Sequence, residues 1–264
     1  MSSSSTPQGI VVAVDGSASS KVATSLPQNF WNQRDKVGQQ ILTDARHVAD
    51  RAILDFDPIT VVERACPGAP IPTLVAVSKD AAMIVVGCRG RGALTQRLLG
   101  SVSSGLVQHA HCPIAVIHDE DPMMDHPALA PVLVGIDGSP ASEIATAIAF
   151  DEASRRGVGL VAMHSWAVED NDFAVSDWAR QLEIGEEALA ERLAGWPERY
   201  PDVPIDRRFV HGDPAQKLLA ASESAQLTVV GSHGRGGFAG MLLGSVSSAV
   251  VQAARMPVIV ARQA

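Results

Sequence analysis

The stretch Gly231-Ser-His-Gly-Arg-Gly-Gly-Phe-Ala-Gly-Met-Leu-Leu-Gly-Ser-Val-Ser-Ser248 decides the fold of this chain. It follows an apolar run at residues 227–230, which predicts a buried strand, and it leads into residues 249–254, which continue a helix. Glycines in such a turn let backbone N–H groups approach a ligand, and a helix N-terminus carries about half a positive charge. Three serine hydroxyls lie at the same helix end, so the stretch is suited to bind a phosphate group.

The same stretch occurs a second time in the chain. Gly87-Cys-Arg-Gly-Arg-Gly-Ala-Leu-Thr-Gln-Arg-Leu-Leu-Gly-Ser-Val-Ser-Ser104 follows its own predicted strand at residues 83–86. Both copies read Gly-x-x-Gly, nine residues, then Gly-Ser. The positions are Gly87, Gly90, Gly100 and Ser101 in the first copy, and Gly231, Gly234, Gly244 and Ser245 in the second. This pattern strongly resembles that of the ATP-binding members of the universal stress protein family. The alternative is a pair of tight turns whose glycines serve only packing.

The composition indicates packed α/β layers. Of the 264 residues, 46% are hydrophobic but only 4% are aromatic, so Val, Ile, Leu and Ala must fill the core. The net charge of −8 and the lack of a basic tract disfavour nucleic acid as a partner. The three cysteines are odd in number and lack metal-ligand spacing, which fits a reducing cytoplasm and predicts no metal site on the protein itself.

The sequence predicts no membrane partner. No apolar run approaches the roughly 20 residues of a membrane span, and residues 1–9 lack the basic and apolar regions of a signal peptide. We therefore expect a cytoplasmic protein in which residues 1–8 form a disordered tail.

The repeat predicts two tandem domains. A strand that runs into Asp-Gly-Ser opens each of them, and Asp15 and Asp137 lie 122 positions apart. We expect the first domain at residues 9–118, an acidic and proline-rich linker at 119–130, and the second domain at 131–264.

The opening of the second domain carries clear helix signals. Ser139 is placed to cap a helix whose first position is Pro140. That helix should end at Gly157, and a second strand should follow at residues 158–164.

The first domain is shorter by about one helix and one strand. Trp31 aligns with Trp178 at an offset of 147 residues, whereas the offset at the opening strand is 122, so 25 residues are missing. They correspond to residues 142–164 of the second domain. Pro27 and the polar residues after it end the short helical pattern of residues 17–24.

Both domains then continue with the same predicted elements. These are an amphipathic helix, a third strand, a helix that begins at a Gly-x-Pro turn, the strand before the glycine loop, and a short final strand. In this order they start at or span residues 41–53, 60–64, 68–70, 83–86 and 113–117 in the first domain, and 186–196, 205–210, 212–214, 227–230 and 257–261 in the second. Alternating strands and helices predict parallel sheets with right-handed crossovers.

The resemblance implies two open parallel sheets of the adenine nucleotide alpha hydrolase-like type, each with strand order 3-2-1-4-5. Ligands of such sheets lie beyond the carboxyl ends of the strands, near the switch in strand order, so Asp137 should lie beside the Gly231 loop. Family members commonly pair through the final strand. We therefore expect the two domains to pack as an internal pseudo-dimer, and a further homodimer is also expected.

The resemblance implies ATP as the ligand, with or without Mg²⁺. The phosphates would contact the glycine loop and the start of the following helix, and the nucleoside would face Asp137, with adenine near His164. The implied binding residues of the second domain are Gly135, Asp137, Gly231, Ser232, His233, Gly234, Arg235, Gly236, Gly237, Gly244, Ser245, Val246 and Ser247.

The first domain keeps the phosphate-binding half of the pattern. Its candidate residues are Asp15, Gly87, Gly90, Arg91, Gly100, Ser101 and Val102. Because its second strand is missing, the wall that would contact adenine is missing too. We predict that the first domain binds ATP weakly or not at all, and that its sheet either closes the third strand onto the first or leaves a gap.

Several candidates have plainer explanations. Asp137 is also suited to serve only as the carboxylate of an Asp-Gly-Ser turn. Arg91 and Arg235 recur at one loop position, where they would pair with phosphate oxygens or remain as exposed loop arginines. His233 is matched by Arg89 in the other copy, which makes it a poor candidate for a catalytic base.

Other nucleotide motifs and catalytic sites find no support. The chain has no Gly-Lys pair, which a P-loop requires, and no Asp or Glu follows Gly231 to grip a ribose as in a dinucleotide fold. No nucleophile, base or metal cluster recurs in both domains. We predict a regulatory, stress-response protein that binds ATP, the alternatives being an interaction module without nucleotide and a slow ATPase.

Overall fold

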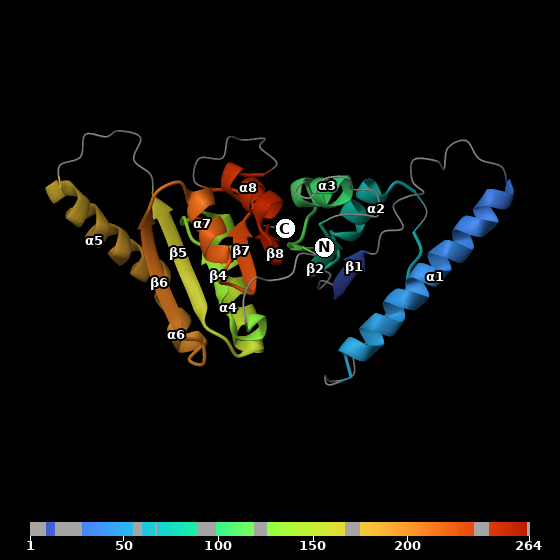
Figure 1. Cartoon of the computed structure of the whole chain (residues 1–264), viewed down its shortest axis with the longest axis horizontal. Helices are drawn as coiled ribbons and strands as arrows, with labels where there is room; N and C mark the ends of the chain where they lie inside the picture. Colours follow the sequence, from blue (N-terminus) through green and yellow to red (C-terminus); the bar gives the residue numbers. More distant parts are fainter. Residues whose placement is uncertain are drawn as a thin grey trace, which may run out of the picture.

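One eight-stranded sheet runs through the whole computed structural model, which describes residues 9–13, 28–54, 60–66, 68–88, 99–118, 126–166, 175–234 and 243–262 (Figure 1). The strand order is β1-β2-β3-β8-β7-β4-β5-β6. The strands are β1 (Ile10–Ala13), β2 (Met83–Gly87), β3 (Ile114–Ile117), β4 (Val132–Gly135), β5 (Leu160–Trp166), β6 (Ile205–His211), β7 (Leu227–Gly231) and β8 (Val258–Ala261).

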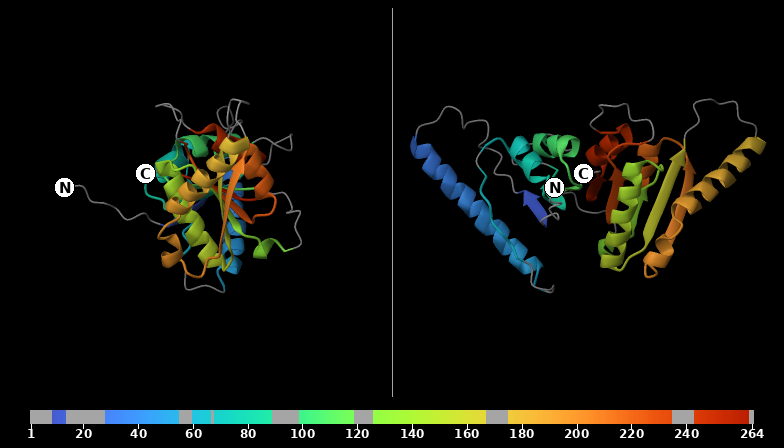
Figure 2. Two further views of the ribbon diagram at one scale, coloured as in Figure 1. Left: turned by 90° about the vertical axis from the view of Figure 1, so that its left-hand side faces the viewer. Right: turned by 180° about the vertical axis from the view of Figure 1, so that it is seen from behind.

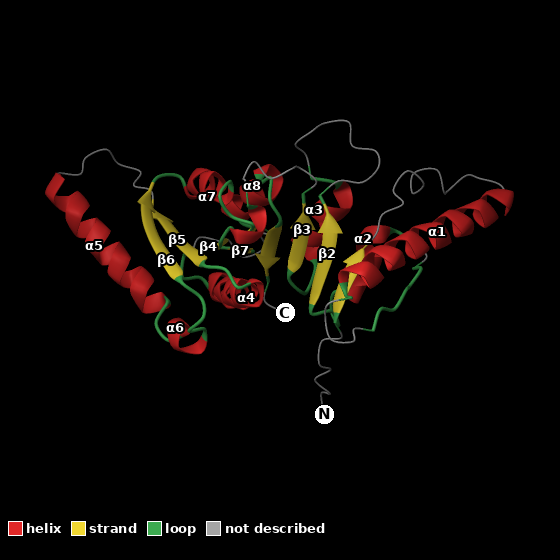
Figure 3. Cartoon of the chain, turned by 60° about the horizontal axis from the view of Figure 1, so that its bottom comes forward, coloured by secondary structure: helices red, strands yellow, loops and turns green. Residues whose placement is uncertain are grey.

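Helices cover both faces of the sheet (Figure 3). They are α1 (Gln28–Ala52), α2 (Pro70–Val77), α3 (Ser101–His109), α4 (Pro140–Arg156), α5 (Val175–Arg192), α6 (Trp196–Arg199), α7 (Pro214–Ser222) and α8 (Ser245–Ala253), with a 3-10 turn at Pro127–Leu129. Among the described residues, no helix has the length and apolar character needed to cross a bilayer.

The second half is a complete open parallel sheet. Its strands are ordered β6-β5-β4-β7-β8, and each neighbouring pair is parallel. If the five strands are numbered by their order along the second half, the sheet order is 3-2-1-4-5, which is the order that the resemblance implies. The order reverses between β4 and β7, so the carboxyl ends of these two strands meet at the switch point where open sheets bind ligands.

Helix α4 forms as the sequence predicts. Ser139 Oγ accepts a hydrogen bond from the Ser142 N–H, Pro140 occupies the first turn, and the helix ends at Gly157 with a φ of 64°. Its buried face is made largely of alanines with Phe150, which lets the helix lie close to the sheet. Full burial of a side chain as large as Phe150 contributes about 1.5–3 kcal/mol.

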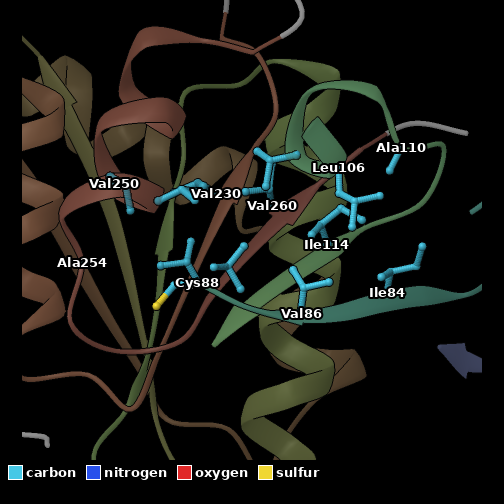
Figure 4. Packing of buried hydrophobic residues seen from close by; sticks show 14 of the residues in the cluster. Ile84, Val86, Cys88, Leu106, Ala110, Ile114, Val230, Val250, Ala254 and Val260 are labelled. Carbon is cyan, nitrogen blue, oxygen red and sulfur yellow. The ribbon is translucent and has the colours of Figure 1, made fainter. Parts of the chain in front are cut away.

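The two halves join through their final strands. β3 and β8 pair antiparallel, with Ile114 opposite Val260 and Val116 opposite Val258, whereas all other neighbouring strands are parallel. Buried side chains from both halves form one core beside this junction (Figure 4), among them Ile84, Leu106, Val230 and Val250. The internal pseudo-dimer that the sequence predicts is therefore confirmed.

The first half departs from the prediction at its third strand. Residues 60–66 are extended but do not pair with any described strand, so the strand predicted at 60–64 is wrong. A strand exists only through hydrogen bonds to a neighbour, and the neighbour that β5 provides in the second half is missing here. Of the two outcomes predicted for this sheet, the gap is the one observed.

The opening strand of the first half is also less buried than predicted. Ile10 and Val12 on β1 are 62% and 65% exposed, whereas Val132 and Val134 on the equivalent strand β4 are fully buried. Helix α4 covers β4, and the missing 25 residues include its counterpart. Helix α1 lies apart from β1, whereas α5 packs on β6 (Figure 2).

The bounds of two predicted helices are corrected. The helix expected at 41–53 begins at Gln28. Pro27 ends the preceding helical pattern, but proline is tolerated directly before the first turn of a new helix. The helix expected at 186–196 begins at Val175 and ends at Arg192. Gly195 then adopts a φ of 82°, which separates the short helix α6 from it.

The remaining elements of the prediction are confirmed where the structure describes them. Both Gly-x-Pro turns begin helices, at Pro70 and Pro214, and Asp213 caps the second by accepting from the Gln216 N–H. The tail at 1–8, the helical pattern at 17–24 and most of the linker at 119–130 lie outside the described residues.

Candidate functional site

Asp137 and Gly234 lie face to face at the switch point of the second half. Asp137 follows β4 and Gly234 follows β7, and these strands are neighbours in the sheet. A Cβ atom added to Gly234 would lie 2.6 Å from Asp137 Oδ2. Only glycine permits this approach, so the Gly231 loop and the Asp137 carboxylate meet as the strand order predicts.

Hydrogen bonds tie the Asp137 turn to the glycine loop. Asp137 Oδ1 accepts from the Ser139 N–H at 2.9 Å, and the Asp137 N–H donates to Ser142 Oγ at 3.1 Å. Ser139 Oγ donates to the carbonyl of His233 at 3.0 Å. One carboxylate oxygen therefore serves the turn, as the plainer explanation of Asp137 proposed, while the other faces Gly234.

The N-terminus of α8 presents free backbone donors beside this pair. The Gly244 N–H donates to the Ser232 carbonyl at 2.7 Å, and the Ser248 N–H donates to the Gly244 carbonyl at 2.9 Å. The N–H groups of Ser245, Val246 and Ser247 have no acceptor among the described residues. Such unpaired N–H groups, together with the helix dipole, attract an anion.

Some groups that the sequence assigns to the ligand are engaged within the protein. Ser247 is buried, and its hydroxyl donates to the Gly231 carbonyl. The Gly244 N–H is committed to Ser232, as noted above. The Ser245 side chain is exposed and remains available, so the donor set is smaller than the motif suggests.

Two of the predicted binding glycines lie in packing contacts, the tighter of them at Gly231. A Cβ atom on Gly231 would lie 2.8 Å from the backbone carbon of Ala141 at the start of α4. A Cβ atom on Gly135 would lie 3.1 Å from the Leu218 side chain on α7. Close helix–sheet packing therefore accounts for glycine at these two positions, whereas Gly234 faces Asp137.

His233 is held within the loop. Its ring Nδ1 lies 3.1 Å from the hydroxyl of Ser232, which is buried. The remaining residues of this loop that the sequence singles out, Arg235, Gly236 and Gly237, lie outside the described residues.

A cleft of about 230 Å³ lies between α5 and the strands β5 and β6. Its aromatic wall consists of His164, Trp166 and Phe209. The Phe209 ring stacks with the His164 ring at a centroid distance of 5.4 Å and with the Trp166 ring at 5.9 Å. Gln181, Ile184, Gly185, Ala188 and Arg192 of α5 complete the lining.

The cleft is linked directly to the Asp137 turn. The His164 ring donates through Nδ1 to the carbonyl of Ile136, the residue before Asp137. On the other side, the Arg192 side chain lies against Gly138. The turn at residues 136–138 therefore contacts the cleft on one side. On its other side, the Asp137 carboxylate meets the glycine loop that leads to α8.

Comparison with known proteins gives the family. The model of the universal stress protein family matches residues 27–118 and again residues 129–262. The chain belongs to the universal stress protein family. The universal stress protein Rv2623 of Mycobacterium tuberculosis is 53% identical over 258 residues, which cover 97% of this chain and 87% of the relative.

Comparison with solved structures supports the fold through one of the two matches below, the first. A universal stress protein from Archaeoglobus fulgidus is similar with a TM-score of 0.63 and 23% identity, covering 91% of this chain and 82% of that one. A universal stress protein in complex with cAMP matches 52% of this chain and 99% of its own, with a TM-score of 0.41 and 24% identity.

In this universal stress protein, the described residues of the first half repeat part of the site. The Gly100 N–H donates to the Cys88 carbonyl at 2.7 Å, as Gly244 does to Ser232 in the second half. Ser101 and Val102 begin α3 after Gly100, and Gly87 ends β2. Asp15, Gly90 and Arg91 lie outside the described residues.

The aromatic cleft of this universal stress protein has no counterpart in the described part of its first half. His164 and Trp166 belong to β5, which the first half lacks, and Ala65 occupies the position of Phe209 at the offset of 144 that the glycine loops share.

Sequence analysis missed Trp166, Phe209 and Arg192. Trp166 shares a strand face with His164 at a spacing of two, a signal that was available. For Arg192 nothing in the local pattern indicated a site, because an arginine in the last turn of a helix is common.

Proposed function

We propose that this universal stress protein binds an adenine nucleotide, ATP, in its second half and uses it as a regulatory signal in a stress response. The observation that carries the proposal is the apposition of Asp137 Oδ2 and Gly234, with the α8 N-terminus on one side and an aromatic cleft on the other. A nucleotide needs these three environments together, because it combines a planar base, a ribose and anionic phosphates.

The described groups fit the parts of the nucleotide. Aromatic rings suit the base, the free oxygen of Asp137 suits the ribose hydroxyls, and the unpaired N–H groups of Ser245 and Val246 suit a phosphate. If Mg²⁺ accompanies ATP, the phosphates would supply most of its ligands, since the described residues contain no cluster of three potential metal-binding side chains.

Binding without rapid turnover is the role that the site supports. Within the described residues, Asp137 is engaged in its turn through one oxygen, and His233 lies against the Ser232 hydroxyl. In this proposal the free oxygen of Asp137 binds the ribose and His233 is held by Ser232, so neither is left as the general base that an attacking water would need within hydrogen-bonding reach.

The proposal is tested by titrating nucleotide into a matched pair of variants. Gly234→Ala places a methyl group against Asp137 Oδ2, so we expect the Kd for ATP to rise at least about tenfold. Gly90→Ala alters the equivalent position of the first half and should leave the Kd within about twofold. Isothermal titration calorimetry measures both, and an equal loss in the two variants would contradict binding by the second half.

A second candidate is an interaction module that works without nucleotide. The exposed apolar side chains of β1, Ile10 and Val12, favour it because such surfaces often contact partners. Mass spectrometry of freshly purified protein separates the two candidates. ATP or another adenine nucleotide carried through purification supports the first, and its absence together with no binding in titration supports the second.

We also propose a cytoplasmic location and a homodimer. Among the described residues no disulfide joins Cys66, Cys88 or Cys112, as expected in a reducing compartment. The final strands β3 and β8 are already paired with each other, so a homodimer must form through another surface.

A further inference from the structure

The guanidinium group of Arg192 lies flat against the backbone of Gly138. A Cβ atom added to Gly138 would lie 2.6 Å from Arg192 Cζ and 2.7 Å from Nε. Gly138 adopts a φ of 76°, which favours glycine, and the arginine fills the space where a side chain would stand. The charge at the end of α5 is thereby held at the turn that carries Asp137.

This charge has no partner among the described residues. Arg155 and Arg156 on α4 pair with Asp151 and Glu152, each at 2.9 Å. Arg192, in contrast, is partly buried and forms no ion pair or hydrogen bond within the described part of the chain. A partly buried guanidinium that lines a cleft and carries five donors is suited to an anionic partner.

The neighbouring carboxylate gives the charge a function. The free oxygen of Asp137 faces the path between the cleft and the α8 N-terminus, and it would repel a phosphate that passes beside it. The net charge of the chain is −8, so attraction of an anion must come from local groups. Arg192 lies on the cleft side of Asp137, where it offsets that repulsion.

We propose that Arg192 binds the phosphate nearest the base, the α-phosphate of the nucleotide. The inference rests on the proposed function and goes beyond the glycine loop, which lies on the other side of Asp137. The order cleft, Arg192, Asp137, α8 places Arg192 next to the base end of the ligand. A guanidinium binds a phosphate through two parallel hydrogen bonds, which orients the nucleotide as well as holding it.

The first half lacks this group. At the offset of 147 that aligns the two tryptophans, Ala45 occupies the position of Arg192. The chain therefore carries this arginine only in the half that also has the aromatic cleft.

The test compares AMP with adenosine, which differ only in the α-phosphate. Calorimetric titration of the full chain at low salt should show that wild-type protein binds AMP more tightly than adenosine. Arg192→Gln should weaken AMP binding about tenfold or more and change adenosine binding less than about twofold. Arg192→Lys should retain part of the preference for AMP, because it keeps the charge without the planar fork.

Two further variants control for folding and for charge. Arg180→Gln removes an exposed arginine from the same helix and should leave both affinities unchanged. Gly138→Ala keeps Arg192 but displaces its guanidinium, so it should reduce the preference for AMP as well. Thermal unfolding shows whether each variant is folded before it is titrated.

The outcomes separate the two proposals. Equal losses of AMP and adenosine binding in Arg192→Gln would make Arg192 a wall of the cleft and overturn the inference. Unchanged binding of both ligands in that variant would overturn it too, while the proposed function would stand. If wild-type protein binds neither ATP, AMP nor adenosine, both the proposed function and the inference fail.

Discussion

Each glycine near the site leaves room for a different neighbouring group. Gly234 admits the Asp137 carboxylate, Gly138 admits the Arg192 guanidinium, and Gly231 admits the backbone of α4. The motif that marks Gly231 and Gly234 as equivalent phosphate-binding positions thus contains one glycine at the candidate site and one in the helix–sheet interface.

Substitution at Gly231 should therefore cost stability. Gly231→Ala brings a methyl group within 2.8 Å of helix backbone, which cannot shift without moving α4, so we expect the free energy of unfolding to fall by about 1–3 kcal/mol. Gly135→Ala is the milder comparison, because its Cβ atom meets side chains, Leu218 at 3.1 Å and Val230 at 3.7 Å, and these can shift more easily than helix backbone. Urea unfolding compares them, and equal losses would refute the distinction.

At the scale of elements, α5 forms one wall of the cleft, and the strands β5 and β6 form the other. Gly185 on α5 allows this contact, because a Cβ atom there would overlap the Phe209 ring. The stacked rings of His164, Trp166 and Phe209 then fix the opposite side. In the described part of the first half there is no counterpart of β5, the strand that carries two of these rings.

A double-mutant cycle measures this contact. Alanine in place of glycine favours a helix by about 1 kcal/mol, but overlap with Phe209 should outweigh that gain and make Gly185→Ala destabilising by about 1–2 kcal/mol. In a Phe209→Ala background the overlap disappears, and the same substitution should become neutral or stabilising. Urea unfolding measures the free energy of unfolding of each variant. A loss in the double variant equal to the sum of the two single losses would contradict the contact.

At the scale of the whole molecule, two reciprocal contacts fasten the halves together. His118 after β3 donates through Nε2 to the Val251 carbonyl on α8 at 3.1 Å, and Arg262 after β8 donates through Nη1 to the Val107 carbonyl on α3 at 2.6 Å. The two donors, His118 and Arg262, lie 144 residues apart, and so do the two acceptors, Val107 and Val251. The junction is thus a pseudo-twofold copy of one arrangement. Burial lowers the pKa of the Arg262 guanidinium, but an arginine side chain still remains charged at neutral pH, so the hydrogen bond is charge-assisted.

Loss of Arg262 should weaken the junction. Arg262→Ala leaves the buried Val107 carbonyl without this donor, so we expect the free energy of unfolding to fall by about 1–3 kcal/mol. Arg262→Lys should restore part of the loss because it retains a charged donor. Arg207→Ala, an exposed arginine of the same half, is the comparison variant, and urea unfolding that ranks it equal to Arg262→Ala would contradict this role.

Sequence alone determined the features that depend on near neighbours in the chain. The repeat, the missing helix and strand, the cap at Ser139 and the end of α4 at Gly157 could all be predicted, because each arises from the chemistry of a few consecutive residues or from comparison of the two copies. The family and the position of Asp137 beside the glycine loop followed from that pattern.

Tertiary structure decided what depends on residues far apart in the chain. Residues 60–64 carry a strand pattern but pair with no described strand, and Ile10 is exposed because no described helix covers it. The engagement of the Ser247 hydroxyl and the position of Arg192 on Gly138 depend on how α8 and α5 pack. A local pattern specifies which contacts a residue is able to make, whereas packing determines which of them form.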